Sequence, residues 1–153
     1  MARLTLPDWH KAPAGCIQPD RAMVQRWLDA YVRAWQAYDE VAIADLWTED
    51  AVWHYAFGIR ARGRAAITSE WMAEKDVFAE GGYDAAYVPI AIDGDTVVTH
   101  GRTRFVDPST AAPRGEFDNV WVLRFGPDGR CAEFHEWYAG RPEHDPTRAI
   151  PDR

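Results

Sequence analysis

Alternation of apolar and polar residues along 115–138 predicts a long antiparallel β-hairpin. Two runs rich in β-branched and aromatic residues flank Pro127-Asp128-Gly129, a combination that favours a tight turn. Because successive strand residues point to opposite faces, alternate residues of each arm share one face. The residues of the more apolar face are Phe117, Asn119, Trp121, Leu123 and Phe125 on the first arm and Phe134, Glu136 and Tyr138 on the second. This apolar face therefore carries two polar side chains, an amide and a carboxyl.

Helical spacing occurs in three segments before the hairpin. Apolar and aromatic residues recur every three or four positions from Arg21 to Tyr38, and Asp20 is a suitable N-cap. Residues 41–47 continue this pattern and predict a second, short helix. Residues 63–75 are expected to form a third helix.

Three other segments have the composition of strands, and we expect strands over residues 51–55, 83–92 and 96–106. Asp93-Gly94 favours a hairpin turn between the last two. Pro89 cannot donate a hydrogen bond to a neighbouring strand, which indicates an edge strand or a bulge. Residues 56–62 are expected to form a loop.

This order of elements predicts an α+β fold. Its sheet is expected to be curved and cone-shaped, mixed or antiparallel, with about five to six strands wrapped around three helices. The domain is expected to span residues 20–140, between an N-terminal arm over 1–19 and a C-terminal tail over 141–153. The open end of such a cone can take a ligand.

Charge and composition narrow the function classes. The 153 residues have a net charge of −7, so a nucleic-acid partner is not expected, because binding to phosphates needs clustered cations. No apolar run approaches the roughly 20 residues that span a bilayer, and the N-terminus lacks the apolar core of a signal peptide. The two cysteines do not make a disulfide framework. We therefore expect a cytoplasmic protein, and its eight tryptophans indicate an aromatic interior.

Four segments carry a resemblance to a known family. They are LWTEDAV at 46–52, GRAAI at 63–67, WVLRF at 121–125 and EWY at 136–138. Together with the element order, they resemble the nuclear transport factor two-like superfamily over about residues 20–140, nearest to its SnoaL-like and ketosteroid-isomerase-like branch. The resemblance implies a small-molecule ligand, no cofactor, and a homodimer through the outer sheet face, which carries Val120, Val122 and Trp137.

The known catalytic sets of the superfamily carry over only in part. Tyr31 matches the tyrosine that hydrogen-bonds the enolate in ketosteroid isomerases, but Tyr55 and Trp121 stand where those enzymes have aspartates. In epoxide hydrolases of the limonene type, an arginine and an aspartate work with a last-strand aspartate. Glu136 fits the last position, whereas Gly101 and Thr103 occupy the other two.

Two further branches of the superfamily suggest roles for other residues. Dehydratases of the superfamily use tyrosines that match Tyr31 and Tyr55, together with a histidine that His100 could supply only if its strand register differs by one. SnoaL-like cyclases need a carboxylate base that points inward, and Glu136 is the best candidate for it.

These matches lead to a candidate site. We expect Glu136 to move the proton, Tyr31 and Tyr55 to donate hydrogen bonds to a developing oxyanion, and Asn119 to orient the substrate. The aromatic walls are expected to be Trp35, Trp53, Trp121, Phe117, Phe134 and Tyr138. The alternatives for Glu136 are an ion pair with Arg124 or Arg102, or exposure at the rim, and each tyrosine can instead be a core residue.

No metal site is expected from residue spacing. The five histidines are His10, His54, His100, His135 and His144, and they show neither H-x-H nor H-E-x-x-H spacing. His54 is expected to face outward because Trp53 faces inward, and His135 faces away from Glu136. Two functions remain: a cofactor-independent isomerase, dehydratase or cyclase acting on an apolar, cyclic or aromatic molecule, and a non-catalytic binding or dimerisation module.

Overall fold

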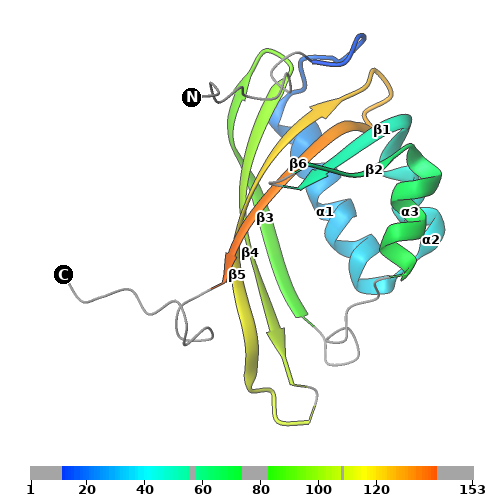
Figure 1. Ribbon diagram of the computed structural model, residues 1–153. Coiled ribbons are helices and arrows are strands. Elements are labelled where there is room, and N and C mark those ends of the chain that lie inside the picture. Colours follow the sequence, from blue (N-terminus) through cyan, green and yellow to red (C-terminus); the bar gives the residue numbers. More distant parts are fainter. Residues whose placement is uncertain (1–11, 56–57, 74–82, 108, 141–153) are drawn as a thin grey trace, which may run out of the picture.

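The computed structural model describes residues 12–55, 58–73, 83–107 and 109–140. They form one six-stranded sheet, in the order β2-β1-β6-β5-β4-β3, and three helices that cover one of its faces (Figure 1). The helices are α1 (Arg21–Ala37), α2 (Glu40–Asp45) and α3 (Arg64–Ala73). The strands are β1 (Trp47–Tyr55), β2 (Gly58–Arg62), β3 (Tyr83–Asp93), β4 (Thr96–Val106), β5 (Pro113–Phe125) and β6 (Cys131–Gly140). The predicted α+β fold is confirmed.

The sheet is mixed, since β1 pairs with β6 in parallel and the other neighbours pair antiparallel. The long strands β3, β4 and β5 extend beyond the helices (Figure 1). Among the described residues, no helix is both long enough and apolar enough to cross a bilayer.

Helix α1 follows the sequence prediction closely. The carboxylate of Asp20 accepts a hydrogen bond from the backbone N–H of Met23, so it caps the helix as expected. The helix ends where Tyr38 adopts a left-handed conformation with φ of 46°. Its buried face consists of Val24, Trp27, Leu28, Tyr31 and Ala34. The aromatic side chains of this face pack against the sheet.

Two predicted boundaries are wrong. The second helix ends at Asp45, and Trp47 already belongs to β1, which is longer than the predicted strand 51–55. The predicted loop 56–62 contains β2, which pairs antiparallel with β1. A short edge strand of this kind needs one partner only, and its own sequence shows little alternation. Residues 74–75 of the predicted third helix, residues 1–11 of the predicted arm over 1–19, and the predicted tail lie outside the described residues.

Pro89 has the predicted role. Strand β3 is an edge strand of the sheet, and its pairing with β4 shifts register between Pro89 and Ala91. Because an edge strand has a neighbour on one side only, a proline in it does not have to donate a hydrogen bond to a second strand.

The apolar face of the β5–β6 hairpin forms the floor of the core, as predicted. Trp121, Leu123, Phe125 and Phe134 are fully buried on it. Tyr31 of α1 lies above this floor, with its ring centroid 4.9 Å from that of Trp121 and 5.9 Å from that of Phe134. The interior is therefore packed with aromatic rings, and only part of it stays open.

Candidate functional site

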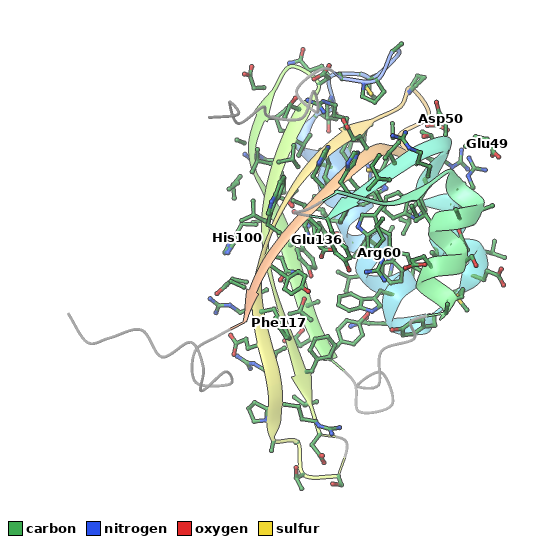
Figure 2. The ribbon with its side chains drawn as sticks, in the orientation of Figure 1. Glu49, Asp50, Arg60, His100, Phe117 and Glu136 are labelled. Carbon is green, nitrogen blue, oxygen red and sulfur yellow. The ribbon has the colours of Figure 1, made fainter. Side chains whose placement is uncertain are left out.

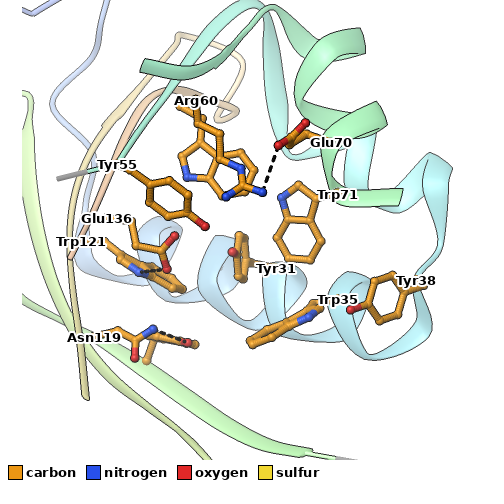
Figure 3. A pocket seen from close by; sticks show the side chains of 12 residues that line it. Tyr31, Trp35, Tyr38, Tyr55, Arg60, Glu70, Trp71, Asn119, Trp121 and Glu136 are labelled. Carbon is orange, nitrogen blue, oxygen red and sulfur yellow. Dashed lines mark hydrogen bonds and ion pairs between the residues drawn. The ribbon is translucent and has the colours of Figure 1, made fainter. Parts of the chain in front are cut away.

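A cavity of about 160 Å³ remains between the helices and the inner face of the sheet. Its lining residues are Tyr31, Trp35, Tyr38, Trp53, Tyr55, Arg60, Glu70, Trp71, Tyr87, Asn119, Trp121 and Glu136 (Figure 3). Cavities of about 150 Å³ in protein cores hold one benzene ring. A space of this volume therefore suits a single ring or a group of similar size.

The cavity brings together seven of the ten predicted site residues. The seven are Glu136, Tyr31, Tyr55, Asn119, Trp121, Trp35 and Trp53. The other three do not line it. Phe134 is fully buried beneath Tyr31, Phe117 packs against Phe105 and Tyr138, and Tyr138 is 59% exposed. Strand alternation identifies the inward face correctly, but it does not tell which of its positions is packed solid and which lies beyond the helix layer.

Glu136 is held between two strands. Tyr55 of β1 is its partner in the parallel pair, and Trp121 of β5 is its partner in the antiparallel pair. The indole Nε1 of Trp121 donates a hydrogen bond of 3.2 Å to Oε1 of Glu136 (Figure 3). Strand register, rather than a loop, therefore sets where this carboxyl lies.

The surroundings of Glu136 change its acidity. Part of the side chain is accessible at the cavity wall, but the carboxyl is enclosed by protein, and this burial raises its pKa from the ordinary 4.5 to about 7. The hydrogen bond from Trp121 and the positive charge of Arg60 favour the ionised form and offset part of the rise. A carboxyl with a pKa near 7 can both take and return a proton at neutral pH.

Glu136 does not pair with Arg124 or Arg102, the two partners that the sequence suggested for it. Arg124 pairs with Glu133 and lies 3.6 Å from Asp95, on the outer face of the sheet. Arg102 pairs with Asp118 at 3.1 Å.

The two tyrosines differ in their environment. Tyr31 is buried, and this burial, followed by the nearby charge of Glu136, raises the pKa of its hydroxyl well above 10. It is therefore a hydrogen-bond donor at every physiological pH. Tyr55 is partly exposed, and its ring lies under the guanidinium of Arg60, with 4.6 Å from Cζ to the ring centroid.

Arg60 was missed by the sequence analysis, which assigned its segment to a loop. It projects from β2 over the rings of Trp53 and Tyr55, and its Nη2 lies 3.0 Å from Oε1 of Glu70 on α3 (Figure 3). Stacking and the ion pair fix this cation at the cavity wall. Trp71, Tyr38, Glu70 and Tyr87 also line the cavity without having been predicted to do so.

Asn119 belongs to a chain of polar groups across the sheet. Its Nδ2 donates to the Tyr87 hydroxyl at 3.4 Å, and that hydroxyl shares a hydrogen bond of 2.7 Å with Thr103. Within the described residues, Oδ1 of Asn119 has no hydrogen-bond partner. This amide oxygen is a buried hydrogen-bond acceptor that is left unsatisfied.

Gly101, which the resemblance aligns with an arginine of the limonene-type epoxide hydrolases, is covered by an aromatic ring. The ring of Tyr87 lies flat on Gly101, its partner across β3 and β4, and a Cβ at position 101 would come within 1.8 Å of that ring. Tyr87 in turn stacks on Trp121, with 3.9 Å between ring centroids. An aromatic stack fills the space that an arginine would need.

His100 does not complete a dehydratase set either. It lies on the outer face of the sheet, where its Nε2 is 3.6 Å from Asp118 (Figure 2). The carboxyl of Glu136 is thus the candidate proton-transfer group of this cavity.

Comparisons with known proteins agree with this architecture. A family model described as the SnoaL-like domain matches residues 28–134. The chain is similar to the solved structure of an LEH-like epoxide hydrolase of M. tuberculosis, with 19% identity, a TM-score of 0.60, and coverage of 79% of this chain and 86% of that one. It is also similar to an NTF2-like protein with a cystatin-like fold from Novosphingobium aromaticivorans, with 21% identity, a TM-score of 0.57, and coverage of 76% and 80%.

A SnoaL-like protein from Burkholderia thailandensis has 20% identity, a TM-score of 0.59, and coverage of 80% of this chain and 99% of that one. At these identities the likeness shows a shared fold alone. No curated protein matches the chain. Because the family model spans more than half of the sequence, the chain belongs to the SnoaL-like domain family.

Proposed function

We propose that this protein is a cofactor-independent enzyme that transfers a proton on a small cyclic or aromatic molecule, with Glu136 as the base. Membership of the SnoaL-like family supports a role in acting on small molecules. The observation that carries the finer proposal is the raised pKa of Glu136, about 7, at the wall of an aromatic cavity. The reaction class is that of isomerases, dehydratases and polyketide cyclases.

Each neighbouring group has a role in this scheme. The Glu136 carboxylate takes a proton from a carbon next to a carbonyl, and the negative charge moves to the carbonyl oxygen. Tyr31 and Tyr55 donate hydrogen bonds to that oxygen, and Trp121 holds the carboxyl in place. The proton then returns to a second atom of the substrate, either to isomerise it or to assist departure of a hydroxyl as water.

The cavity walls restrict the substrate. A volume of about 160 Å³ takes one ring, and indole and phenol rings make up most of its lining. The polar groups that recognise the ring's substituents are the Asn119 amide and the Arg60 guanidinium. We therefore propose a substrate that carries a carbonyl and a hydroxyl on a single ring, or on the terminal ring of a larger molecule.

The second candidate is a non-catalytic binding or dimerisation module. It is favoured by the incomplete catalytic sets, since Tyr55, Trp121 and Gly101 occupy positions that bear catalytic aspartates or arginine in enzymes of related branches. A homodimer through the outer sheet face remains a prediction in either case.

A generic proton-abstraction probe separates the two candidates. In 5-nitrobenzisoxazole, removal of the proton on carbon breaks the ring N–O bond and yields a coloured phenolate, so absorbance reports a single base-dependent step. We expect the wild-type rate to rise with pH and level off above about 7. Glu136→Gln should lower the rate at least about 100-fold, the usual contribution of a general base.

Tyr138→Phe is the matched control, because this residue lies on the same strand but outside the cavity. It should retain the wild-type rate. Loss of turnover with retained binding of the probe in Glu136→Gln supports the enzyme. An unchanged rate in Glu136→Gln overturns the catalytic proposal and leaves the binding module.

A further inference from the structure

The outer face of the same two strands carries a second cluster of functional groups. The parallel pairing of β1 with β6 sets His54 beside His135, just as it sets Tyr55 beside Glu136 on the inner face. Glu133 lies two residues before His135 and therefore on the same outer face. Oε1 of Glu133 is 3.5 Å from Nε2 of His54 and 3.1 Å from Nε2 of His135.

The carboxylate of Glu133 is fixed in this orientation from its other side. Its Oε2 accepts a hydrogen bond from Nη1 of Arg124, the direct partner of Glu133 across β5 and β6. Nε of Arg124 lies 3.6 Å from Asp95, so a second carboxylate balances the charge of the guanidinium. Oε1 is thus left directed at the two imidazoles.

We propose that His54, His135 and Glu133 form a binding site for a divalent transition-metal ion of the Zn²⁺ type. Two imidazoles and one carboxylate are a ligand set that binds Zn²⁺ and its neighbours in the first transition series. The three ligand atoms all lie within 4.8 Å of one another. A water molecule completes the coordination at the fourth position.

The distances suit such an ion. Metal–ligand bonds of about 2.0–2.1 Å at tetrahedral angles separate two ligand atoms by about 3.3 Å. The two N–O separations, 3.5 and 3.1 Å, lie on either side of this value. The imidazole rings are stacked, 4.0 Å apart and 10° from parallel, so one ring has to rotate before both Nε2 lone pairs point at the same ion. His54 is the ring that we expect to rotate, because its side chain is 18% exposed whereas that of His135 is 5% exposed.

The spacing of histidines along the sequence did not predict this site. His54 and His135 are far apart in the chain and come together only through the parallel strand pair, which no local motif announces. Metal binding at this site does not depend on the proposed catalysis. A bound ion would link β1 to β6 on the outer face of the sheet, whereas Tyr55 and Glu136 lie on the inner face of the same two strands.

Calorimetric titration of Zn²⁺ into the tag-free, chelator-treated full chain tests the proposal. We expect saturable binding of one Zn²⁺ per chain, and a higher melting temperature when Zn²⁺ is present. His54→Gln should weaken binding at least about 100-fold, since loss of groups that merely support a ligand already costs 10–100-fold. His100→Gln is the matched control, because His100 is a histidine on the same outer face that also lies near a carboxylate.

A second measurement guards against a folding defect in the variant. Co²⁺ in place of Zn²⁺ should give the visible absorption of a tetrahedral nitrogen and oxygen site in wild type and His100→Gln, and lose it in His54→Gln. Circular dichroism should show the same fold in all three proteins. Absence of one-per-chain binding in the wild type, or equal binding by His54→Gln and wild type, overturns the proposal.

Discussion

Trp121 and Glu136 face each other across β5 and β6, and the indole Nε1 of Trp121 donates a hydrogen bond of 3.2 Å to the Glu136 carboxyl. The indole ring is itself fully buried and is stacked on Tyr87. The donor therefore has little freedom to turn away when the carboxyl gains or loses a proton. Changes around this pair should shift the pKa of Glu136 in directions that follow from the sign of each interaction.

Replacing Trp121 by Phe removes the hydrogen bond that favours the ionised carboxylate. We expect the pKa of Glu136 to rise above its wild-type value of about 7. Carbon-13 NMR of carboxyl-labelled glutamate measures the shift. Trp137→Phe, on the outer face of β6, is the control and should leave the pKa unchanged; a lower pKa in Trp121→Phe would contradict the assigned role of the indole.

Arg60 should act on Glu136 through its charge. Arg60→Gln removes a nearby cation that stabilises the carboxylate, so the pKa of Glu136 should rise. Arg62→Gln is the control, because Arg62 lies on the same short strand, is exposed, and does not line the cavity. The pH–rate profile with 5-nitrobenzisoxazole should shift to higher pH in Arg60→Gln alone, and a shared shift in both variants would point to net charge instead.

The raised pKa also predicts how stability depends on pH. Unfolded Glu136 titrates near 4.5 and folded Glu136 near 7, so the folded state binds the proton more tightly. Its contribution to stability is fully present below pH 4.5 and is lost as the pH rises through 7. From pH 4 to 8, Glu136→Gln should gain about 3 kcal/mol in unfolding free energy relative to wild type.

Urea unfolding at several pH values measures this difference. Glu49→Gln, whose side chain is 86% exposed, is the control and should follow the wild-type pH dependence (Figure 2). A constant difference between Glu136→Gln and wild type across this range would mean that the carboxyl titrates normally.

Gly101 should be required for the aromatic stack behind the cavity. In Gly101→Ala the new methyl group would collide with the ring of Tyr87, and we expect a loss of about 1–3 kcal/mol of stability. Gly140→Ala is the matched control, because its nearest contact would be an ordinary 3.4 Å to Phe117. Chemical denaturation should separate the two variants, and equal stability would show that Tyr87 can move aside without cost.

Local patterns account for the parts of the fold that the sequence predicted well. Helix α1 has its own cap in Asp20 and a complete buried stripe, and the β5–β6 hairpin has a turn signal and clear alternation. Strand β2 has neither, because its structure depends on pairing with β1. Arg60 was missed for this reason, since its segment was assigned to a loop.

The sequence predicted which face of the hairpin points inward, but not which residues of that face line the cavity. Alternation put Glu136, Asn119 and Trp121 on the inward side, and all three line the cavity. It put Phe117 and Tyr138 on the same side, although Phe117 packs in its own aromatic cluster and Tyr138 is exposed. Which inward positions meet a helix, and which strands become neighbours, are long-range properties that period alone does not encode.

The pKa of Glu136 in the wild-type protein is the quantity on which the proposed proton transfer depends. Carbon-13 NMR of carboxyl-labelled glutamate across pH 4 to 9, with the signal assigned by its absence in Glu136→Gln, measures it directly. The structure predicts a midpoint near 7. A midpoint near 4.5, the ordinary value for glutamate, would contradict a buried carboxyl poised to carry a proton.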